Sequence, residues 1–579
     1  MARSFDIYKV SIEDKTFYRQ DGFSTEQTAH IILFNSKGKE IEELFLAYPK
    51  LNEIYEAIEN GNPINLDNCY IKGFSLTACR RYLLKNKFDQ IDIESFSAQN
   101  AFFHSPYDID FSFANFKGEK LNLSNTSFVG GTLNFREATF NCNEVLFNDQ
   151  FARVDKLDMT QCQFNGKILT LKNTIFAEGV KDFQDTDFGQ GDISFVNTDF
   201  GSGNVSFINT QFNNSNVSFK IARFGSGKED FRFAKFGCGT VSFDQTDFGP
   251  GRIDFRNVEF GSGKTSFNRC IFSEGEVTFE GAEVRKGKIT FLRSSFGAMD
   301  VSFEIFEGHE AEMVFEKVIF PGNVNFTNGL FKKLTFNLCQ FNGTLNLHVD
   351  KAKEIDLYGC IARDIIDYYS HGDSPKVETF NITGLRLLGR LYVQWEANGI
   401  KKLIYSQSDT TIDEKASQFR VLKENFNGLG RYEDEDKAYV EYMRCTQKGY
   451  LEKDLAKSMI SKAVAYPKYY SKLLIFDWMG LYATSPVRVI FSILVIQVIF
   501  SLLYSLFSII GIGDVVSNLN PEPMLFFKSL YICVITFFTV GYGEFIPLGY
   551  SRVLSGLVGF MGVFLMSYFT VAFVRKILR

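Results

Sequence analysis

The sequence predicts a multidomain protein in which an all-β solenoid is followed by an α-helical linker and an α-helical membrane region. Two observations carry this prediction. Phenylalanine recurs with a period of twelve residues through the first half of the chain, and two long charge-free apolar runs flank a shorter one near the C-terminus. The boundaries we expect are an α/β capping region at 1–100, the solenoid at 101–360, the linker at 361–485 and the membrane region at 486–579.

Composition argues against several classes of function. Of the 579 residues 22% are charged and the net charge is −6, which is typical of a mostly soluble chain. Cysteine and histidine are scattered without paired or metal-ligand spacing, and no nucleophile–base pair or phosphate-binding loop stands out. We therefore expect neither an enzyme nor a bound cofactor. No basic run indicates nucleic acid as a partner, and the N-terminus lacks an apolar signal core, so the soluble part is expected in the cytoplasm.

The phenylalanine repeat predicts the solenoid. Spacings of seven and five residues alternate without a break over Phe176–Phe279, and a weaker version reaches back to Phe111 and forward to Phe320. Over Phe326–Phe341 the spacing tightens to five. A repeat of this length indicates stacked supersecondary units that share one core. We expect the rings to fill that core, and the alternative is an aromatic ladder that binds a ligand.

The residue two positions before a phenylalanine is alternately β-branched and small in most repeats, and the small-x-Phe-x-x units resemble pentapeptide repeats. That resemblance implies a four-sided right-handed β-helix with one unit per face. Here two extra residues follow each pair of units, usually within Gly-x-Gly, as at Gly201–Gly203, Gly225–Gly227 and Gly249–Gly251. Glycine accepts positive φ without steric cost, so we expect these segments at corners. Four faces then make a coil of twice the period, about 24 residues.

The segments on either side of the solenoid have their own patterns. Before it, a strand is expected at Thr28–Phe34 and a helix at Leu51–Ile58, in a region that caps the first coil. After it, Ala416–Lys453 predicts two helices interrupted at Gly428–Gly430. This stretch resembles the helical hairpin that joins pentapeptide repeats to membrane segments in multidomain bacterial proteins. The aromatic and basic residues of Tyr466–Tyr482 favour an interfacial amphipathic segment, with an ordinary connecting helix as the alternative.

The apolar runs near the C-terminus predict a membrane hairpin. Val489–Gly513 and Val553–Val574 are each long enough to cross a bilayer core of about 30 Å as helices. Ser529–Thr539 is too short to cross, so we expect it to enter the membrane and turn back. It leads directly into the pentapeptide Thr539, Val540, Gly541, Tyr542, Gly543.

This pentapeptide resembles the TVGYG selectivity filter of potassium channels, and the hairpin around it resembles a two-span potassium channel. The resemblance implies a homotetramer around one axis, with K⁺ as the permeant ion and no other cofactor. Main-chain carbonyls of Thr539 to Tyr542 and the Thr539 hydroxyl would then replace the hydration shell of K⁺. Neighbouring carbonyls point the same way only if left- and right-handed dihedrals alternate, which favours Gly541 and Gly543.

Residues around the pentapeptide receive roles from the same resemblance. Glu544 stands where the family has aspartate, and Tyr531 stands at the position of a pore-helix aromatic, so we expect a hydroxyl contact between them. Thr536 matches the family, whereas Phe538 replaces its common threonine. Tyr531, Thr536 and Glu544 are therefore expected to support the filter.

Glycines of the second span are the candidates for gating. Gly562 falls within one residue of the family's inner-helix hinge, and we expect it to be the gating hinge. Gly556 and Gly559 are expected at close-packing positions instead. Neither span carries a ladder of basic residues, which argues against voltage sensing by an arginine helix.

Charges beside the spans predict the orientation of the chain. Basic residues precede the first span and end the second: Lys468, Lys472 and Arg488, then Arg575, Lys576 and Arg579. The positive-inside rule then places both termini in the cytoplasm of a multi-pass protein in the cell (inner or plasma) membrane. We expect a tetrameric K⁺ channel in the lipid bilayer, regulated or localised by its solenoid. The alternative is a membrane-anchored scaffold whose solenoid binds a protein. The gating stimulus and the partner or ligand of the solenoid stay open.

Overall fold

The computed structural model describes residues 3–368, 377–457, 459–517 and 523–578. Arg579, one of the basic residues used for the orientation, lies outside this set. The chain divides into two compact units, Met1–Gln407 and Ser408–Arg579. The predicted fold class is confirmed, because the first unit contains a β-solenoid and the second is mainly helical, with two helices long and apolar enough to cross a membrane.

A small α/β region precedes the regular coils. Its elements are the antiparallel sheet strands β1 (Ile7–Glu13), β4 (Thr28–Phe34) and β5 (Glu40–Ala47), the hairpin strands β2 (Phe17–Tyr18) and β3 (Ser24–Thr25), and the helices α1 (Leu51–Glu59) and α2 (Leu76–Tyr82). The strand and the helix expected here are both present. Phe5 packs its ring against Phe102 and Phe151 of the first coils, at centroid distances of 5.8 and 4.7 Å. An aromatic core therefore joins the N-terminal segment to the solenoid.

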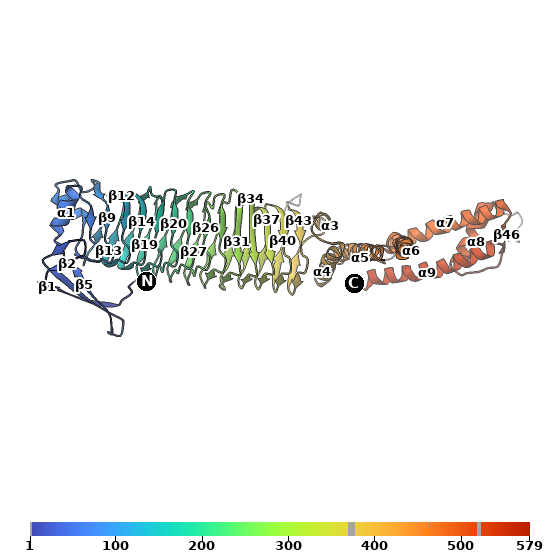
Figure 1. Cartoon of the computed structure of the whole chain (residues 1–579). Coiled ribbons are helices and arrows are strands. Elements are labelled where there is room, and N and C mark those ends of the chain that lie inside the picture. Colours follow the sequence, from blue (N-terminus) through green and yellow to red (C-terminus); the bar gives the residue numbers. More distant parts are fainter. Residues whose placement is uncertain (1–2, 369–376, 458, 518–522, 579) are drawn as a thin grey trace. The chain divides into compact units, whose positions relative to one another are not determined.

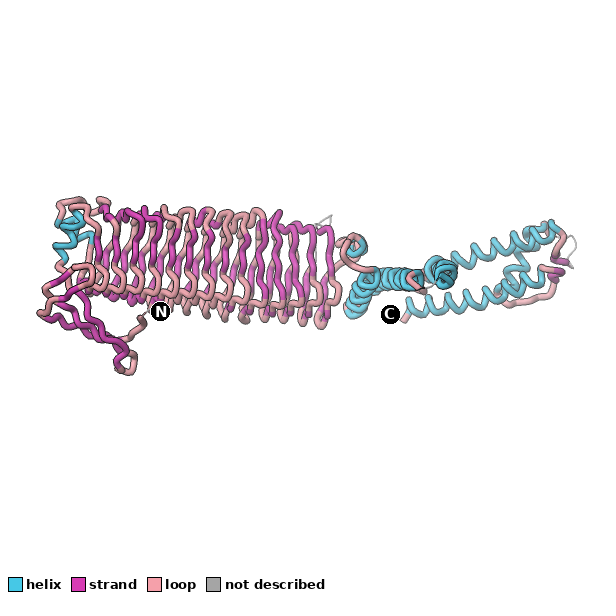
Figure 2. The backbone as a smooth tube through the Cα atoms, viewed as in Figure 1, coloured by secondary structure: helices cyan, strands magenta, loops and turns pink. Residues whose placement is uncertain are grey.

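The coils have four faces and 24 residues in their regular part. Four separate ladders connect one coil to the next, each with an offset of 24 residues: Asp192 with Asn216, Asp199 with Arg223, Val205 with Glu229, and Gln211 with Lys235. In Figures 1 and 2 these strands stack side by side along the first unit. The coil size expected from the twelve-residue period is confirmed.

Strand pairing continues beyond both ends of the 101–360 range. Two 16-stranded sheets run from β6 (Ile64–Asn65) to β43 (Val377–Asn381) and from β7 (Tyr70–Lys72) to β45 (Arg390–Tyr392), a six-stranded sheet runs from β29 (Ile271–Phe272) to β44 (Arg386–Leu387), and β22 (Gln211–Asn213) pairs with β25 (Lys235–Phe236). The offset falls to 21 residues where Val324 pairs with Leu345. The last coils lack the phenylalanine signal because aliphatic residues such as Leu347 and Leu357 fill the buried positions.

Stacked phenylalanine rings form the core. Phe219, Phe243 and Phe267 are fully buried, and successive rings lie nearly parallel with centroids 4.8 Å apart. Such offset stacks contribute about 0.5–1.5 kcal/mol per pair beyond the area they bury. This packing supports the core interpretation of the repeat rather than a ligand-binding ladder.

Close stacking of the coils explains the Gly-x-Gly corners better than backbone handedness does. Gly201, Gly203 and Gly249 have positive φ as expected, but Gly225 and Gly227 do not. A Cβ on Gly225 would lie 2.2 Å from the carbonyl oxygen of Gly201, and one on Gly227 would lie 2.0 Å from that of Gly203. The expectation that positive φ selects these glycines is therefore wrong for part of them, because steric contact with the preceding coil selects glycine there.

The recurring left-handed residue lies at another corner and is mostly not glycine. It follows each alternate phenylalanine by two positions and recurs every twelve residues, for example at Asn173, Asp185, Asn197 and Asn209. Asparagine tolerates this conformation and adds a ladder, since Asn197 Nδ2 donates to Asn173 Oδ1 at 3.0 Å. Amide side chains therefore link the coils along this corner.

The second unit begins with a helical hairpin. The hairpin consists of α4 (Ile412–Gly428) and α5 (Tyr432–Leu455). The other elements of the second unit are α6 (Met459–Lys472), the π-helical turn η1 (Leu473–Trp478), α7 (Pro486–Ile510), β46 (Gly513–Ser517), α8 (Leu525–Phe537), β47 (Phe545–Gly549) and α9 (Ser551–Ile577). Thr411 caps α4 by accepting from the Glu414 N–H, and the Glu414 carboxylate accepts from the Thr411 N–H in return. The predicted break between two helices is present, with Gly430 in the left-handed region.

Candidate functional site

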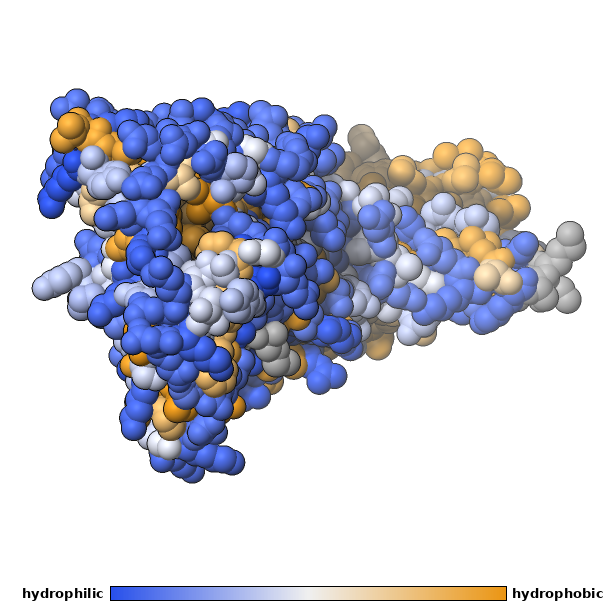
Figure 3. Space-filling model, turned by 60° about the vertical axis from the view of Figure 1, so that its left-hand side comes forward, coloured by the Kyte–Doolittle hydropathy of each residue, from blue (hydrophilic) through white to orange (hydrophobic). Residues whose placement is uncertain are grey.

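Two long apolar helices and one short one make up the C-terminal part of the chain. At 1.5 Å per residue the 25 residues of α7 extend about 38 Å, enough to cross a bilayer core, whereas the 13 residues of α8 extend only about 20 Å. In the most apolar windows of α7 and α9 only 28% and 22% of residues are buried. Figure 3 shows hydrophobic surface gathered on this unit, while the visible solenoid face is mostly hydrophilic. Exposed apolar surface of this extent calls for lipid or further protein copies.

The short helix α8 is held between the two long ones. The Ser505 hydroxyl of α7 donates to the Ser529 hydroxyl of α8 at 3.0 Å, and Tyr504 of α7 bonds Ser555 of α9 at 2.7 Å. A Cβ on Gly562 of α9 would lie only 2.0 Å from the carbonyl oxygen of Phe537, the last residue of α8. The end of α8 therefore rests directly on the α9 backbone.

The glycines of α9 differ in how closely they pack within one chain. Gly562, the expected hinge, packs tightly within the chain. At Gly556 and Gly559 a Cβ would meet no described atom of the chain within 4 Å. The close-packing position within one chain is therefore Gly562, because it alone of the three faces the end of α8.

The pentapeptide follows α8 with alternating backbone handedness. Thr539, Gly541 and Gly543 have φ of 56°, 63° and 78°, whereas Val540 and Tyr542 lie outside the positive-φ region. The N–H groups of Thr539 and Val540 donate to the last turn of α8, to Thr536 and Ile535 carbonyls at 3.1 and 2.8 Å. For a β-branched residue such as Thr539 a left-handed conformation is uncommon. The alternation that carbonyl alignment requires is present at these residues.

One chain leaves the pentapeptide uncovered. Val540 is 47% and Tyr542 69% exposed, and a Cβ on Gly541 or Gly543 would meet no described atom within 4 Å. Irregular backbone at membrane depth is tolerated only where protein or water satisfies it. A single chain therefore leaves this backbone open to water or to further protein.

The residues expected to support the pentapeptide lie beside it. The Tyr531 hydroxyl donates to Glu544 Oε2 at 3.2 Å, and the Tyr531 ring packs on Phe545 with centroids 5.0 Å apart. This is the contact that the sequence predicted. Thr536 is half-buried in the last turn of α8, while Phe538 is 44% exposed and receives the Thr539 hydroxyl on its carbonyl at 2.7 Å. The loop after the pentapeptide is anchored by the antiparallel pair β46–β47.

The far end of α9 is fixed by ion pairs that the sequence analysis missed. Arg575 Nη2 lies 3.0 Å from Asp436 Oδ1, and Lys576 Nζ lies 3.0 Å from Asp436 Oδ2. Glu435 is 3.8 Å from Arg575, and the guanidinium lies over the Tyr439 ring at 4.5 Å. The only sequence signal was the run of acidic residues that opens α5. We call these contacts the α9 clamp.

A second set of contacts ties α5 to the segment before α7. Arg444 makes two parallel bonds to the buried carboxylate of Asp477, both at 2.8 Å, and also pairs with Glu441 at 2.8 Å. The hydrogen bonds to Asp477 raise the pKa of Arg444 above its ordinary value, so the guanidinium stays charged. Tyr568 of α9 donates to the Phe476 carbonyl at 3.0 Å. Helix α5 thus contacts both the approach to α7 and the end of α9.

Comparison with known proteins assigns a class to this part of the chain. The family model described as "Ion channel" matches residues 489–579, which include almost all of α7, all of α8 and the pentapeptide, and α9. No curated protein and no solved structure shows significant similarity to the chain. This match supports an ion-channel domain in the C-terminal region, where two helices are long and apolar enough to cross a membrane, and the β-solenoid precedes this region.

Proposed function

We propose that the protein is a homotetrameric, K⁺-selective channel of the cytoplasmic membrane that conducts through Thr539–Gly543. The observation that carries this proposal is a TVGYG segment with alternating handedness, exposed at the end of a short helix between two spans. A ring of four copies would surround a K⁺ ion with main-chain carbonyl oxygens in place of water. Helix α8 ends at Phe537, so the negative end of its dipole lies next to the entrance of the pentapeptide and favours a cation there.

Ion flux through purified protein in liposomes tests this proposal. We expect K⁺ to pass at least about tenfold faster than Na⁺, a difference of about 1.4 kcal/mol in barrier height. Equal passage of the two ions would contradict the assignment of the selectivity. Native mass measurement in detergent should give four chains per particle. A protein that never assembles would favour the membrane-anchored scaffold instead.

The proposal includes a regulatory role for the soluble part, and the α9 clamp supports it. Helix α5 belongs to the hairpin that follows the solenoid in sequence, and Asp436 on α5 pairs with both Arg575 and Lys576. With both termini in the cytoplasm, this is the cytoplasmic end of α9. Because Asp436 is largely buried, its ion pairs are worth more than exposed ones. A force on the hairpin would therefore reach the pore helix.

Replacing Asp436 by asparagine is expected to raise the open probability of the channel while single-channel conductance stays the same. The substitution removes the charge that restrains the last turn of α9, so the helix moves more readily. Mutation of residues that couple two sites changes the coupling free energy by about 0.5–2 kcal/mol, which corresponds to a change of roughly 2- to 30-fold in the equilibrium between closed and open states. Single-channel recording in planar bilayers measures both quantities.

The matched control is Asp434→Asn. Asp434 lies two residues earlier on α5 and pairs with Arg431 within the same hairpin. The Asp434→Asn substitution removes one acidic charge without altering a contact to α9, so the open probability should remain at the wild-type level. An unchanged open probability in Asp436→Asn would reject the clamp as a route of regulation.

A further inference from the structure

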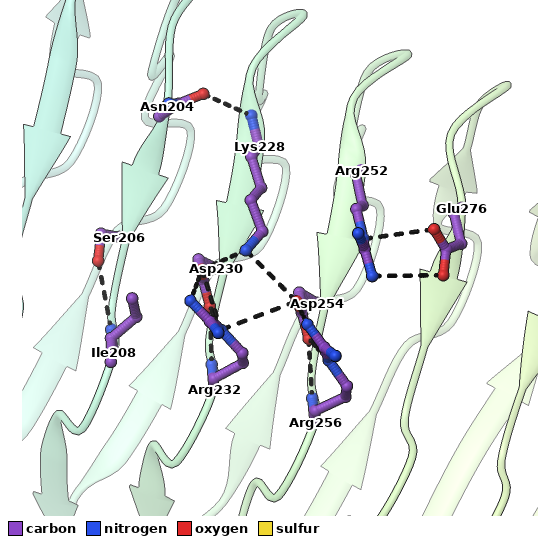
Figure 4. A network of polar contacts seen from close by, with 10 residues as sticks. All are labelled: Asn204, Ser206, Ile208, Lys228, Asp230, Arg232, Arg252, Asp254, Arg256 and Glu276. Carbon is purple, nitrogen blue, oxygen red and sulfur yellow. Dashed lines mark hydrogen bonds and ion pairs between the residues drawn. The ribbon is translucent and has the colours of Figure 1, made fainter.

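Strand β24 (Lys228–Asp230) places one carboxyl group inside the solenoid. Alternation along the strand points Lys228 and Asp230 outward, where Figure 4 shows them joined with Asp254 in an ion-pair network. Glu229 lies between them and points inward, with no exposed surface. Among the described residues none forms a hydrogen bond with either carboxyl oxygen of Glu229. An unpaired carboxylate in such a place is strongly destabilising, so the group needs a counter-charge or a proton.

The residues on either side of Glu229 in the ladder are apolar. Glu229 pairs with Val205 on one side and Ile253 on the other, and Val277 follows. The nearest basic group on the same strand, Lys228, points to the other side of the strand and is already bound by Asp230 and Asp254 there. No neighbour in the ladder therefore neutralises the carboxyl group.

Two coils earlier, the same ladder shows what this corner of the solenoid binds. Lys181 precedes Val205 in the ladder and is 2% exposed. Its ammonium group donates to the main-chain carbonyls of Ala177, Gly179 and Ser202 at 2.7, 2.9 and 2.9 Å. The corner is thus a cage of carbonyl oxygens that holds a monovalent cation, here supplied by a side chain.

At Glu229 the same corner presents a carboxylate to carbonyl oxygens. The residues that correspond to the acceptors of Lys181, 48 positions later, are Gly225, Gly227 and Pro250. Beside Gly251, the carbonyl oxygen of Gly227 and Oε2 of Glu229 lie 1.7 and 2.9 Å from one point, the place a Cβ would occupy. The two oxygen acceptors therefore lie close to one another, and each would gain from a cation between them.

We propose that this corner binds one monovalent metal ion of the size of K⁺, ligated by the Glu229 carboxylate and by main-chain carbonyls of the neighbouring corners. One carboxylate balances one positive charge, and the carbonyls are neutral. In the Lys181 cage the ammonium nitrogen lies 2.7–2.9 Å from the carbonyl oxygens. These distances exceed the metal–oxygen distances of roughly 2.3–2.6 Å for Ca²⁺ and roughly 2.0–2.1 Å for Mg²⁺. The competing occupant is a proton, since burial raises the pKa of Glu229 to about 9.

Hydrogen exchange of the full-length protein in detergent, in KCl or in choline chloride of equal ionic strength, tests the site. We expect K⁺ to slow exchange in peptides covering 225–230 and 249–254. The factor is 1 + [K⁺]/Kd, roughly tenfold when the K⁺ concentration is ten times Kd. Any response of the pore to K⁺ appears in separate peptides around 539–543, so failure of the channel proposal and failure of this one are distinguishable.

Two variants and one control make the result specific. Glu229→Gln should lose the K⁺ effect at both peptides. Glu229→Val, which installs the residue found at Val205, should lose it too and should unfold at a higher temperature than wild type in choline chloride. Glu259→Gln, on the same solenoid but paired with Lys235 at the surface, should keep it. Equal exchange in both salts, protection by CaCl₂ alone, or protection that survives in Glu229→Gln would each overturn the proposal.

Discussion

Gly541→Ala is expected to abolish K⁺ flux while the solenoid stays folded. Gly541 has φ of 63°, and an added Cβ would meet no described atom within 4 Å, so the substitution acts through the backbone and not through a clash. A left-handed conformation costs an L-residue roughly 1–2 kcal/mol, or about 4–8 kcal/mol over four copies. Relief of that strain turns carbonyl groups away from the axis. Flux in liposomes should fall more than about 100-fold, with the thermal unfolding of the β-structure unchanged.

The chain offers a control with the same local properties. Gly511 ends α7 with φ of 78°, and a Cβ there also meets no described atom within 4 Å. Gly511→Ala therefore carries similar backbone strain outside the pentapeptide and should conduct close to the wild-type rate. If Gly541→Ala conducted as well as Gly511→Ala, the pentapeptide would not be the selective part of the pore.

Gly562→Ala is expected to reduce flux at least about tenfold, equivalent to about 1.4 kcal/mol, and to lower the thermal stability of the pore domain. The new Cβ would lie 2.0 Å from the Phe537 carbonyl oxygen, a distance at which α8 or α9 must move. Helix α8 is held on its other side by the Ser505–Ser529 hydrogen bond. Its displaced end lies two residues before Thr539, so the shift passes directly into the pentapeptide.

The result also separates packing from hinge bending at Gly562. A hinge glycine replaced by alanine would change opening kinetics with little effect on stability, whereas a packing glycine would change conduction and stability together. Gly559→Ala, three residues earlier on the same helix, has open space in the chain and should be tolerated. Normal stability in Gly562→Ala would contradict the packing role.

The sequence predicted the solenoid well because its core repeats along a single axis, one coil after another. Most inward positions are filled by a residue type that repeats, so the period of phenylalanine translates directly into a 24-residue coil. The phenylalanine period gives no signal where Leu347 and Leu357 take over, since aliphatic residues carry no distinctive period. Sequence reasoning misjudged Gly225 and Gly227, because contact between coils is not visible in local sequence.

In the C-terminal region the sequence predicted the local features but not the contacts between residues far apart in the chain. The pentapeptide and the Tyr531–Glu544 contact are local, within 13 residues of one another. The α9 clamp joins residues on helices far apart in sequence, Asp436 and Arg575, and single-sequence patterns do not reveal such pairs. Gly562 shows the same limit, since its distinction from Gly559 depends on which face of α9 meets α8.

The regular coil also sets the step by which the length of the solenoid can change. Because each face recurs after 24 residues, gain or loss of one whole turn would change the column by about 4.8 Å and keep every side chain on its original side. Half a turn would instead carry a segment to the opposite sheet. Related proteins whose solenoids differ in length should therefore differ by whole turns, with the segments before and after the solenoid preserved.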